Sequence, residues 1–220
     1  MANKKLVIWG ASGHALVVAN IVRLRKEYEI IGYLDDMNIE RKGESFNGSV
    51  ILGGREQLTS LREQGVKNII IGIGDCNARL RLSDFIKSFG FSLITAIHPQ
   101  AIISSDVRIG NGTVINAGVI IDPGVIIGEN VIINKGVLIG HGSIIGDGVH
   151  IAGGTNVSGN VKIGRGTFIG VGTSIIERIN IGSNSVIGAG SVIVRDIPDN
   201  VIAYGVPAKV IREKEKQDEI

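Results

Sequence analysis

VIIGEN VIINKG VLIGHG SIIGDG is the sequence of residues 125–148, and it divides into blocks of six with isoleucine at the third place of every block. The same division runs from residue 101 to residue 196 as sixteen consecutive hexads, in which the third place is Ile fifteen times and Val once. A six-residue period with one aliphatic place and small residues near the end of each block is typical of a parallel β-helix. We therefore predict a β-helix over these residues.

The spacing also predicts how such a β-helix is built. Each hexad forms a short strand and a corner, and its third side chain points inward onto the equivalent side chains of the neighbouring coils. Small residues at the fourth to sixth places allow the positive φ angles that tight corners need. With three hexads in each triangular coil, residues 18 apart stack at the strand spacing of ~4.8 Å, and the repeats make about five coils. The spacing leaves the handedness open.

Residues 1–98 follow a different pattern, because apolar runs alternate with helix-like segments. This alternation indicates a small parallel sheet with helices on its faces, so the fold class is α/β followed by all-β. The expected strands are 5–10, 29–36, 66–75 and 91–99, with a short extra strand at 49–52, and the expected helices are 10–29, 55–65 and 77–90. We divide the chain into an α/β domain at 1–98, a β-helix at 99–196 and a C-terminal cap at 197–220. The cap is expected to be an irregular loop followed by a short charged helix or tail.

The composition excludes several classes of function. The 23 basic and 21 acidic residues give a net charge of +2 without long blocks of one sign, which provides no electrostatic case for binding nucleic acid or a membrane. Cys76 is the only cysteine, so no internal disulfide can form and a reducing compartment is expected. The apolar stretch near the N-terminus is too short for a signal peptide or a membrane span. We therefore expect a soluble, cytoplasmic protein.

GASGH, residues 10–14, stands where the first expected strand turns into the first helix. In an open α/β sheet such a turn offers backbone N–H groups and a helix N-terminus to an anion. The turn lacks the GxGxxG pattern, so a nucleotide or nucleotide-sugar suits it better than a dinucleotide. Asp35 and Asp36 end the second strand, where they can accept hydrogen bonds from ribose hydroxyls or a base N–H, and Gly74 ends the third strand at the same edge. Alternatively, the glycines only shape a tight turn and the aspartates cap a loop.

Two histidines stand out in a repeat that is otherwise built from aliphatic residues and glycine. His141 is fifth in its hexad, at a corner where it stacks between Pro123 and Gly159. His150 is second in its hexad and points outward, beside Asn134 from the coil before. The two histidines diverge within one chain, and they converge only where the face of one subunit meets the corner of another, as in a threefold assembly of prisms. The simpler alternative is that both are solvated surface residues.

Taken together, the hexads, GASGH at 10–14, YLDD at 33–36, the set of Asn134, His141 and His150, and YGVPAK at 204–209 resemble one known family. This family is the hexapeptide-repeat nucleotide-sugar acetyltransferases of the PglD and NeuD type, and the resemblance covers essentially the whole chain. It implies a small Rossmann-like domain that holds a nucleotide-linked sugar, followed by a left-handed β-helix. It also implies a homotrimer with acetyl-CoA in the groove between neighbouring β-helices.

The resemblance implies roles for single residues as well. His141 matches the catalytic base, Asn134 assists it, and His150 is the second histidine of the site and also contacts the coenzyme. The resemblance assigns further coenzyme contacts to Gly159, whose N–H would reach the thioester carbonyl, and to Val171, Ala189, Gly205, Pro207 and Lys209. It assigns the sugar nucleotide to Gly10, Ser12, Gly13, His14, Asp35, Asp36 and Gly74. No metal is implied.

The chain departs from the family pattern directly after the catalytic histidine, where the family usually has an acidic residue and this sequence has Gly142. An acid at that place would orient the imidazole and stabilise its protonated form. Three interpretations stay open: a backbone carbonyl or water holds His141, another carboxylate such as Asp122 or Asp147 substitutes, or the activity is reduced. An amine acceptor needs less help from a base than a hydroxyl does, so N-acetylation is favoured.

We therefore predict an acetyl-CoA-dependent N-acetyltransferase for a nucleotide-linked amino sugar of the 4-amino-4,6-dideoxy type, active in bacterial glycan biosynthesis. Transfer is expected to be direct, without a covalent enzyme intermediate. The first alternative is an O-acetyltransferase acting on a sialic-acid-like sugar or another small hydroxyl acceptor. A serine- or maltose-type acyltransferase shares the β-helix but would not need residues 1–98. A non-catalytic β-helix scaffold is the alternative from another class, and it would not bind acetyl-CoA.

Overall fold

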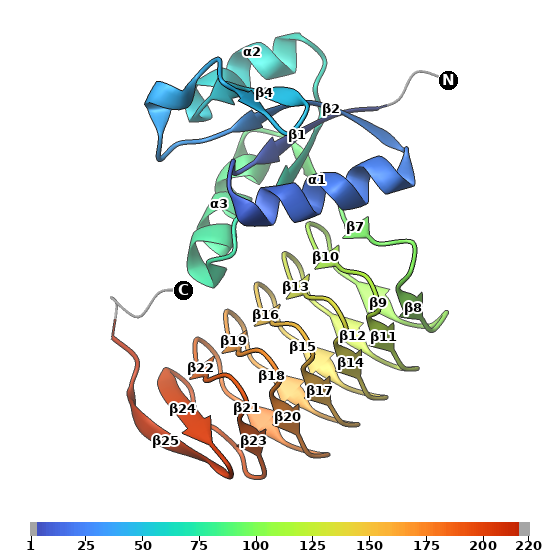
Figure 1. Ribbon diagram of the computed structural model, residues 1–220, viewed down its shortest axis with the longest axis vertical. Coiled ribbons are helices and arrows are strands. Elements are labelled where there is room, and N and C mark those ends of the chain that lie inside the picture. The colour runs from blue at the N-terminus through green and yellow to red at the C-terminus, as the bar shows by residue number, and fades with distance from the viewer. Residues whose placement is uncertain (1–3, 216–220) are drawn as a thin grey trace.

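The computed structural model describes residues 4–215 and shows an α/β domain packed against one side of a β-helix (Figure 1). The α/β domain runs from β1 (Lys4–Trp9) to β6 (Ser92–Leu93), and the β-helix begins at β7 (Ala96–Ile97). Helix α1 (Gly13–Arg25) packs on one face of the sheet, and α2 (Leu58–Glu63) and α3 (Cys76–Ser88) pack on the other. Both α1 and α3 reach the β-helix, whereas α2 lies away from it.

The sheet of the α/β domain has the strand order β3-β4-β2-β1-β5-β6, and all neighbouring strands are parallel except β3 and β4. The remaining elements of the domain are the strands β2 (Tyr28–Leu34), β3 (Ser45–Phe46), β4 (Ser49–Gly53) and β5 (Asn68–Ile71) and the short 3-10 helices η1 (Ile39–Arg41) and η2 (Arg55–Gln57). The carboxyl ends of β1 and β5 therefore flank the switch point at which open α/β sheets bind their ligands. The expected parallel sheet and the extra strand at 49–52 are confirmed.

Alternate residues of β1 supply the two apolar cores of the α/β domain, as the period of two in a strand requires. Leu6 joins the cluster under α1, and Val7 joins the cluster under α2 and α3. The cluster under α1 also contains Ala96 of β7 and Val114 of the next coil. One continuous apolar layer thus joins the domain to the β-helix and fixes where the switch point stands over it.

The β-helix has three faces of short parallel strands, and strands that are neighbours on a face lie 18 residues apart in the sequence. Face 1 consists of β7, β10 (Val114–Ile115), β13 (Ile132–Ile133), β16 (His150–Ile151), β19 (Phe168–Ile169) and β22 (Val186–Ile187). Face 2 consists of β8 (Ile102–Ile103), β11 (Ile120–Ile121), β14 (Leu138–Ile139), β17 (Asn156–Val157), β20 (Ser174–Ile175) and β23 (Val192–Ile193). Face 3 consists of β9 (Arg108–Ile109), β12 (Ile126–Ile127), β15 (Ile144–Ile145), β18 (Lys162–Ile163) and β21 (Asn180–Ile181). The expected coil of three hexads is confirmed, as is the left-handed β-helix that the family resemblance implies.

Two places of every hexad, and not one, fill the interior of the β-helix. The third-place side chains from Ile115 to Ile193 are at most 3% exposed, as expected. From Thr113 onward the first place, which the sequence analysis did not assign to the core, is buried as well, and it holds Val, Ser or Thr in every hexad except the one that begins with Ile179. The hydroxyl groups stay satisfied because they donate to backbone carbonyls, as Thr113 Oγ1 does to Gly128 O at 3.0 Å.

The corners form at the sixth place of the hexads, where φ is positive. Most of these residues are glycine, and Asn130 and Asn160 adopt φ values of 55° and 59° because asparagine tolerates the left-handed region better than most residues. Gly142, the departure from the family pattern, occupies this place with a φ of 65°, and a Cβ atom there would lie 2.6 Å from Asn160 Oδ1. The backbone and the neighbouring coil therefore both favour glycine at residue 142.

Two segments differ from the expectations. The strand expected at 91–99 is divided: β6 joins the α/β sheet, whereas β7 pairs with β10 because Ile97 already occupies the inward place, 18 residues before Ile115. The prediction that the C-terminal cap is an irregular loop followed by a short charged helix or tail is wrong. Instead, β24 (Val201–Gly205) and β25 (Ala208–Glu213) form an antiparallel hairpin that extends face 1. The hairpin pairs with the open edge of β22, and this pairing outweighs the helical preference of the charged residues. The end of the expected tail, 216–220, lies outside the described residues.

Replacing an inward isoleucine should destabilise the β-helix far more than replacing its outward neighbour. Ile163 of β18 is buried, and Lys162 beside it is exposed. We expect Ile163→Ala to lower the free energy of unfolding by about 2–5 kcal/mol, because it leaves a cavity in a close-packed core. Lys162→Ala should change it by less than about 0.5 kcal/mol. Urea unfolding followed by circular dichroism measures both, and equal losses in the two variants would contradict the orientation of β18.

Candidate active site

His150 and Asn134 contact each other on face 1 and meet the α/β domain there. Asn134 Nδ2 lies 3.1 Å from His150 Nε2, and His150 Nδ1 lies 3.2 Å from the carbonyl oxygen of Gly74. Because a carbonyl oxygen can only accept, Nδ1 carries the proton and Nε2 accepts from the Asn134 amide. The expectation that Asn134 and His150 are neighbours on one face is confirmed. The contact with Gly74, in the loop after β5, was not foreseen from the sequence.

His14, the second residue of α1, faces the same place. Its ring centroid lies 6.5 Å from that of His150. Burial lowers the pKa of His150 to about 4 and that of His14 to about 3, and the nearby charge of Arg79 acts in the same direction on both. Both imidazoles are therefore neutral at neutral pH. His14 Nε2 is buried without a hydrogen-bond partner in the described chain, which suits an atom that contacts a ligand.

Arg79 is a residue of this region that the sequence analysis missed. It is fully buried on α3, and its guanidinium group donates to backbone carbonyls of both the α/β domain and the β-helix. A signal was present in the sequence, because Arg79, Ser83 and Ile86 fall on one face at helical spacing, and an arginine in an apolar stripe needs buried partners. The pattern could not say which carbonyl groups those partners are.

His141 lies at a different corner, between faces 2 and 3, and it is exposed. Its ring covers Gly159 of the next coil so closely that a Cβ atom at Gly159 would lie 2.5 Å from His141 Cε1. The stacking between Pro123 and Gly159 is confirmed, since Gly142 N–H donates to Pro123 O and the following coil pairs with His141 O. Within one chain, His141 does not meet the histidine and asparagine of face 1.

The turn at residues 10–14 combines a close backbone approach with an open helix N-terminus. Gly10 has a φ of 123°, and a Cβ atom there would lie 2.7 Å from Gly72 O, so the ends of β1 and β5 can approach only with glycine at this place. Ser12 precedes α1 but its side chain makes no capping hydrogen bond, and both Ser12 and Gly13 are exposed. The first N–H groups of α1 are thus placed to bind an anion at the switch point.

Asp35 and Asp36 are already engaged within the chain. Asp35 is 7% exposed and accepts hydrogen bonds from the N–H groups of Met37 and Asn38. Asp36 accepts from both the backbone and the guanidinium group of Arg55. These contacts are those of a capped loop, which is the alternative interpretation of the two aspartates. Their contacts to a ribose or a base stay a prediction.

Apart from His150, the residues assigned to the coenzyme form two groups on different corners. The first group consists of Val171 and Ala189 at the corner between faces 1 and 2, which Asn134 shares, with Gly205, Pro207 and Lys209 in the cap hairpin. Gly205 N–H donates to Ser191 Oγ at 3.3 Å, which holds the hairpin at that corner. The second group is Gly159 beneath His141. One chain keeps the two groups apart.

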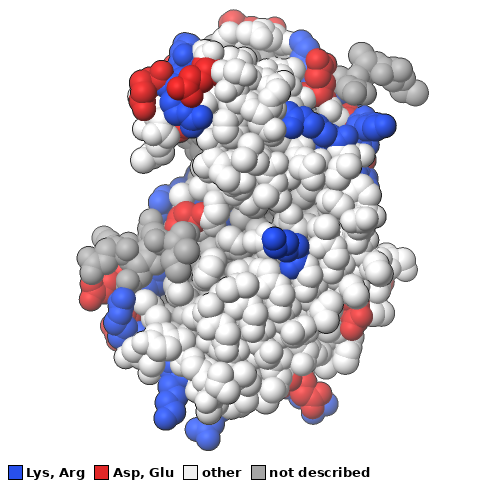
Figure 2. All heavy atoms as spheres, viewed as in Figure 1, with Lys and Arg blue, Asp and Glu red and all other residues white. Residues whose placement is uncertain are grey.

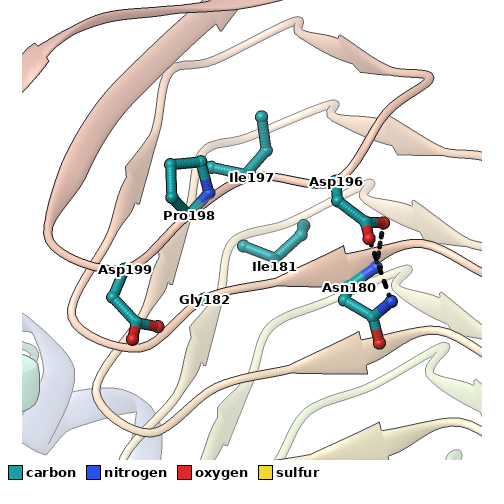
Figure 3. Close-up of a pocket in the computed structure, with 7 residues that line it drawn as sticks. All are labelled: Asn180, Ile181, Gly182, Asp196, Ile197, Pro198 and Asp199. Atoms are coloured by element: carbon teal, nitrogen blue, oxygen red, sulfur yellow. Dashed lines mark hydrogen bonds between the residues drawn. The ribbon is translucent and has the colours of Figure 1, made fainter.

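A separate pocket lies on face 3, where β21 meets the segment 196–199 (Figure 3). Asp196 accepts hydrogen bonds from the backbone N–H and the side-chain amide of Asn180, and these bonds lower its pKa. Asp199 accepts from the backbone N–H of Ser183. The carboxylates thus stabilise the end of the β-helix. The residues that line this pocket include none of the expected site residues.

Two other kinds of site are absent from residues 4–215. No helix there is both long and apolar enough to cross a membrane. The same residues contain no group of three or more His, Cys, Asp and Glu side chains that could hold a metal ion. That the reaction needs no metal stays a prediction.

Comparison with protein families matches both parts of the chain. Residues 5–86 match the model described as the PglD N-terminal domain. Residues 160–195 match the model described as bacterial transferase hexapeptide (six repeats). Both matches agree with the two-part fold.

Three proteins to which this chain is similar show the extent of the resemblance. UDP-N-acetylbacillosamine N-acetyltransferase of Bacillus subtilis (strain 168) is 36% identical over 118 residues, which are 52% of each chain, so the match spans about half of that relative. The structure of PerB from Caulobacter crescentus, in complex with CoA and GDP-perosamine, is 37% identical and has a TM-score of 0.90. The match covers 95% of this chain and 98% of that one. The acetyltransferase domain of PglB from Neisseria gonorrhoeae FA1090 is 35% identical, with a TM-score of 0.88 and coverage of 95% of this chain and 100% of that one.

The likeness to PerB extends over both domains, because it covers 95% of this chain at 37% identity. The turn at 10–14, the hexads and the histidine–asparagine pair are all present in their expected places in the fold. This chain therefore belongs to the hexapeptide-repeat nucleotide-sugar N-acetyltransferase family with a PglD-type N-terminal domain.

Proposed function

We propose that this protein transfers an acetyl group from acetyl-CoA to the amine of a nucleotide-linked amino sugar of the 4-amino-4,6-dideoxy type. The observation that carries the proposal is the contact of His150 with Gly74, because it joins the polar pair of the β-helix to the switch point of the α/β sheet. A sugar nucleotide bound at that edge by its phosphates would present its sugar to face 1. The names of the relatives support this substrate class, since one enzyme is named for a UDP-linked sugar and another was solved with CoA and GDP-perosamine.

The outward faces of the β-helix support a homotrimer in which face 2 lies toward the threefold axis. Face 1 is covered by the α/β domain, and face 3 carries the outward charges Arg108 and Lys162. The outward places of face 2 carry no charge: they are Ile102, Ile120, Leu138, Asn156, Ser174 and Val192. The side of the β-helix in view in Figure 2 likewise carries few charged residues. Burying a face without charges against other copies costs the least desolvation.

Such an assembly would complete the site from two chains. A face that lies toward a threefold axis places its two edges against two different neighbours. The edge that face 2 shares with face 1 carries Asn134 and Val171, and the edge that it shares with face 3 carries His141 and Gly159. Each interface would then join Asn134 and its partner His150 to the His141 of the next subunit. Acetyl-CoA would lie in each of the three equivalent clefts.

The reaction proposed for this cleft is a direct transfer. The lone pair of the sugar amine attacks the thioester carbonyl, a C–N bond forms, and His141 accepts the proton of the amine. The C–S bond then breaks, and the proton passes to the departing sulfur. The N–H of Gly159 would stabilise the oxyanion in between. His150 orients the site and takes no proton, because its Nδ1 already carries one and Asn134 occupies its Nε2.

Of the two carboxylates considered as replacements for the acid missing at Gly142, Asp122 is the better placed. It follows β11 at the corner of His141, one coil earlier. Asp147 belongs to the corner between faces 3 and 1, where it accepts a hydrogen bond from Arg165 at 3.2 Å. The lack of an acid directly after His141 also favours an amine over a hydroxyl acceptor, which is more difficult to deprotonate. N-acetylation is therefore preferred to O-acetylation.

The proposed location is the cytoplasm. Cys76 is buried and unpaired, which agrees with a reducing compartment.

Loss of the base should abolish most of the activity. The test uses acetyl-CoA with a panel of UDP-, GDP- and dTDP-linked 4-amino sugars and measures the release of free thiol. We expect at least one pair to react, and we expect His141→Ala to lower kcat by about 10² or more, since losing a general base typically costs 10²- to 10⁴-fold. Circular dichroism serves as the control for folding. A near-native kcat in His141→Ala would remove this residue from the mechanism, and no reaction with any sugar would contradict the proposed substrate class.

A mixing experiment tests whether two chains share each site. His141→Ala and Asn134→Ala are co-expressed with different tags, and trimers that carry both tags are purified. If each site takes His141 from one chain and Asn134 from the next, every trimer that carries both tags contains one intact site in three, so about a third of the wild-type sites should be restored. The separate variants, mixed without exchange of subunits, are the control. If the doubly tagged trimers are no more active than that control, the two residues act within one chain.

A further inference from the structure

Arg79 of α3 is a buried cation whose partners are almost all backbone carbonyl groups. Its side chain has no exposed surface. Nη1 donates to the carbonyl oxygens of Gly74 at 2.8 Å and Ile73 at 3.1 Å. Nε donates to Asn130 O at 2.7 Å, and Nη2 donates to Gly148 O at 2.8 Å. One guanidinium group thus joins the loop after β5 to two successive coils at the corner between faces 3 and 1.

The same carbonyl groups determine the position of His150 from two directions. Gly74 O, which Arg79 Nη1 holds, is also the acceptor for the Nδ1–H of His150 at 3.2 Å. Gly148 and Val149, which accept from Nη2 at 2.8 Å and 3.5 Å, directly precede His150 in the chain. Arg79 therefore holds both the backbone that leads into His150 and the group to which its imidazole donates.

The imidazole transmits this constraint to Asn134. With the proton on Nδ1, His150 Nε2 offers its lone pair to Asn134 Nδ2 at 3.1 Å. Asn134 Oδ1 accepts in turn from Nδ2 of the buried Asn116 at 3.3 Å. If the Gly74 carbonyl moved away, the other tautomer would become available, and the Nε2–H group would face the amide donor of Asn134. The hydrogen bond that orients Asn134 would then be lost.

We propose that Arg79 is a positioning residue for the acetyl transfer: by holding the Gly74 carbonyl against His150 Nδ1, it selects the Nδ1–H tautomer and so fixes the amide of Asn134 at the subunit cleft. The inference rests on the proposed function, because Arg79 acts on the reaction only through His150 and Asn134. Lysine cannot take this role. Its ammonium group places three donors at one point, whereas the planar guanidinium group reaches carbonyls on separate segments.

The test compares Arg79→Lys and Arg79→Met with Ser83→Ala in the full-length protein. Ser83 is buried on the same face of α3, and its Oγ accepts from Asn130 Nδ2 at 2.8 Å. Ser83→Ala therefore weakens the contact between the two domains without removing any hydrogen bond between Arg79 and Asn134. The sequence has four histidines, and spectra of ¹⁵N-labelled histidine are assigned to His150 by the loss of its signals in His150→Gln. We expect one Nδ1–H tautomer in the wild type and in Ser83→Ala, and a mixture of tautomers in both Arg79 variants.

The kinetic result should separate positioning from folding. We expect Arg79→Lys to lower kcat about 10- to 100-fold, because small displacements of positioning groups cost this much. The KM for acetyl-CoA should stay within about threefold, and Ser83→Ala should keep kcat within about twofold. In a His150→Gln background, replacing Arg79 should cause no further loss, because both residues act through one chain of hydrogen bonds. Should Arg79→Met fail to fold, Arg79→Lys carries the comparison.

The proposal is overturned if Arg79→Lys keeps kcat within about twofold, if its kcat falls while His150 keeps its tautomer, or if the losses at Arg79 and His150 multiply in the double variant. Failure of the proposed function looks different, because the wild-type protein then releases no thiol with any sugar nucleotide. In that case the spectra alone decide, and an unchanged His150 tautomer in the Arg79 variants overturns the selection of the tautomer by Arg79.

Discussion

Stacking of β-branched side chains at intervals of 18 residues is the constraint on which the rest of the molecule depends. A single coil cannot bury its own inward residues, so each coil needs the coils above and below it. Once the interior is set, the place of a residue in its hexad determines its direction. His150 points outward from the second place, Asn134 follows a strand at the fourth, and His141 stands at a corner in the fifth. The site is thus arranged by the packing of residues that take no part in the chemistry.

Much of this arrangement was accessible from the sequence because a period of six is an unusually strong signal. The coil, the faces and the pairing of Asn134 with His150 all follow from it. The cap was not predictable in the same way, since Lys209, Arg212 and Glu213 give its last strand a charged character and only the unpaired strand edge beside it favours a hairpin. The buried first place was missed because it holds Ser or Thr as well as Val, and a hydroxyl group is expected on the surface unless its buried carbonyl acceptor is known.

The contacts between the two domains could not be predicted from the sequence. At this interface Arg79 donates to backbone carbonyl groups, such as those of Gly74 and Gly148. Every residue has such a group, so a pattern of side chains does not show which ones are used. Gly142 is a second case in which the backbone explains what the family pattern does not. Its positive φ and the Asn160 side chain against it explain the glycine locally, whereas comparison of motifs alone presents it as a missing acid. Backbone geometry is what distinguishes these two interpretations.

The strict length of the coil restricts how such a chain can gain or lose residues. Between Asn134 and Val171, an insertion or deletion of one or two hexads would turn every later strand onto a different face. Val171 would then leave the corner it shares with Asn134, even though each new strand would still bury its isoleucine. Only whole coils can be exchanged without turning the prism, and each would lengthen or shorten the cleft by about 4.8 Å. Evolutionary change in the span of this cleft is therefore expected in discrete steps.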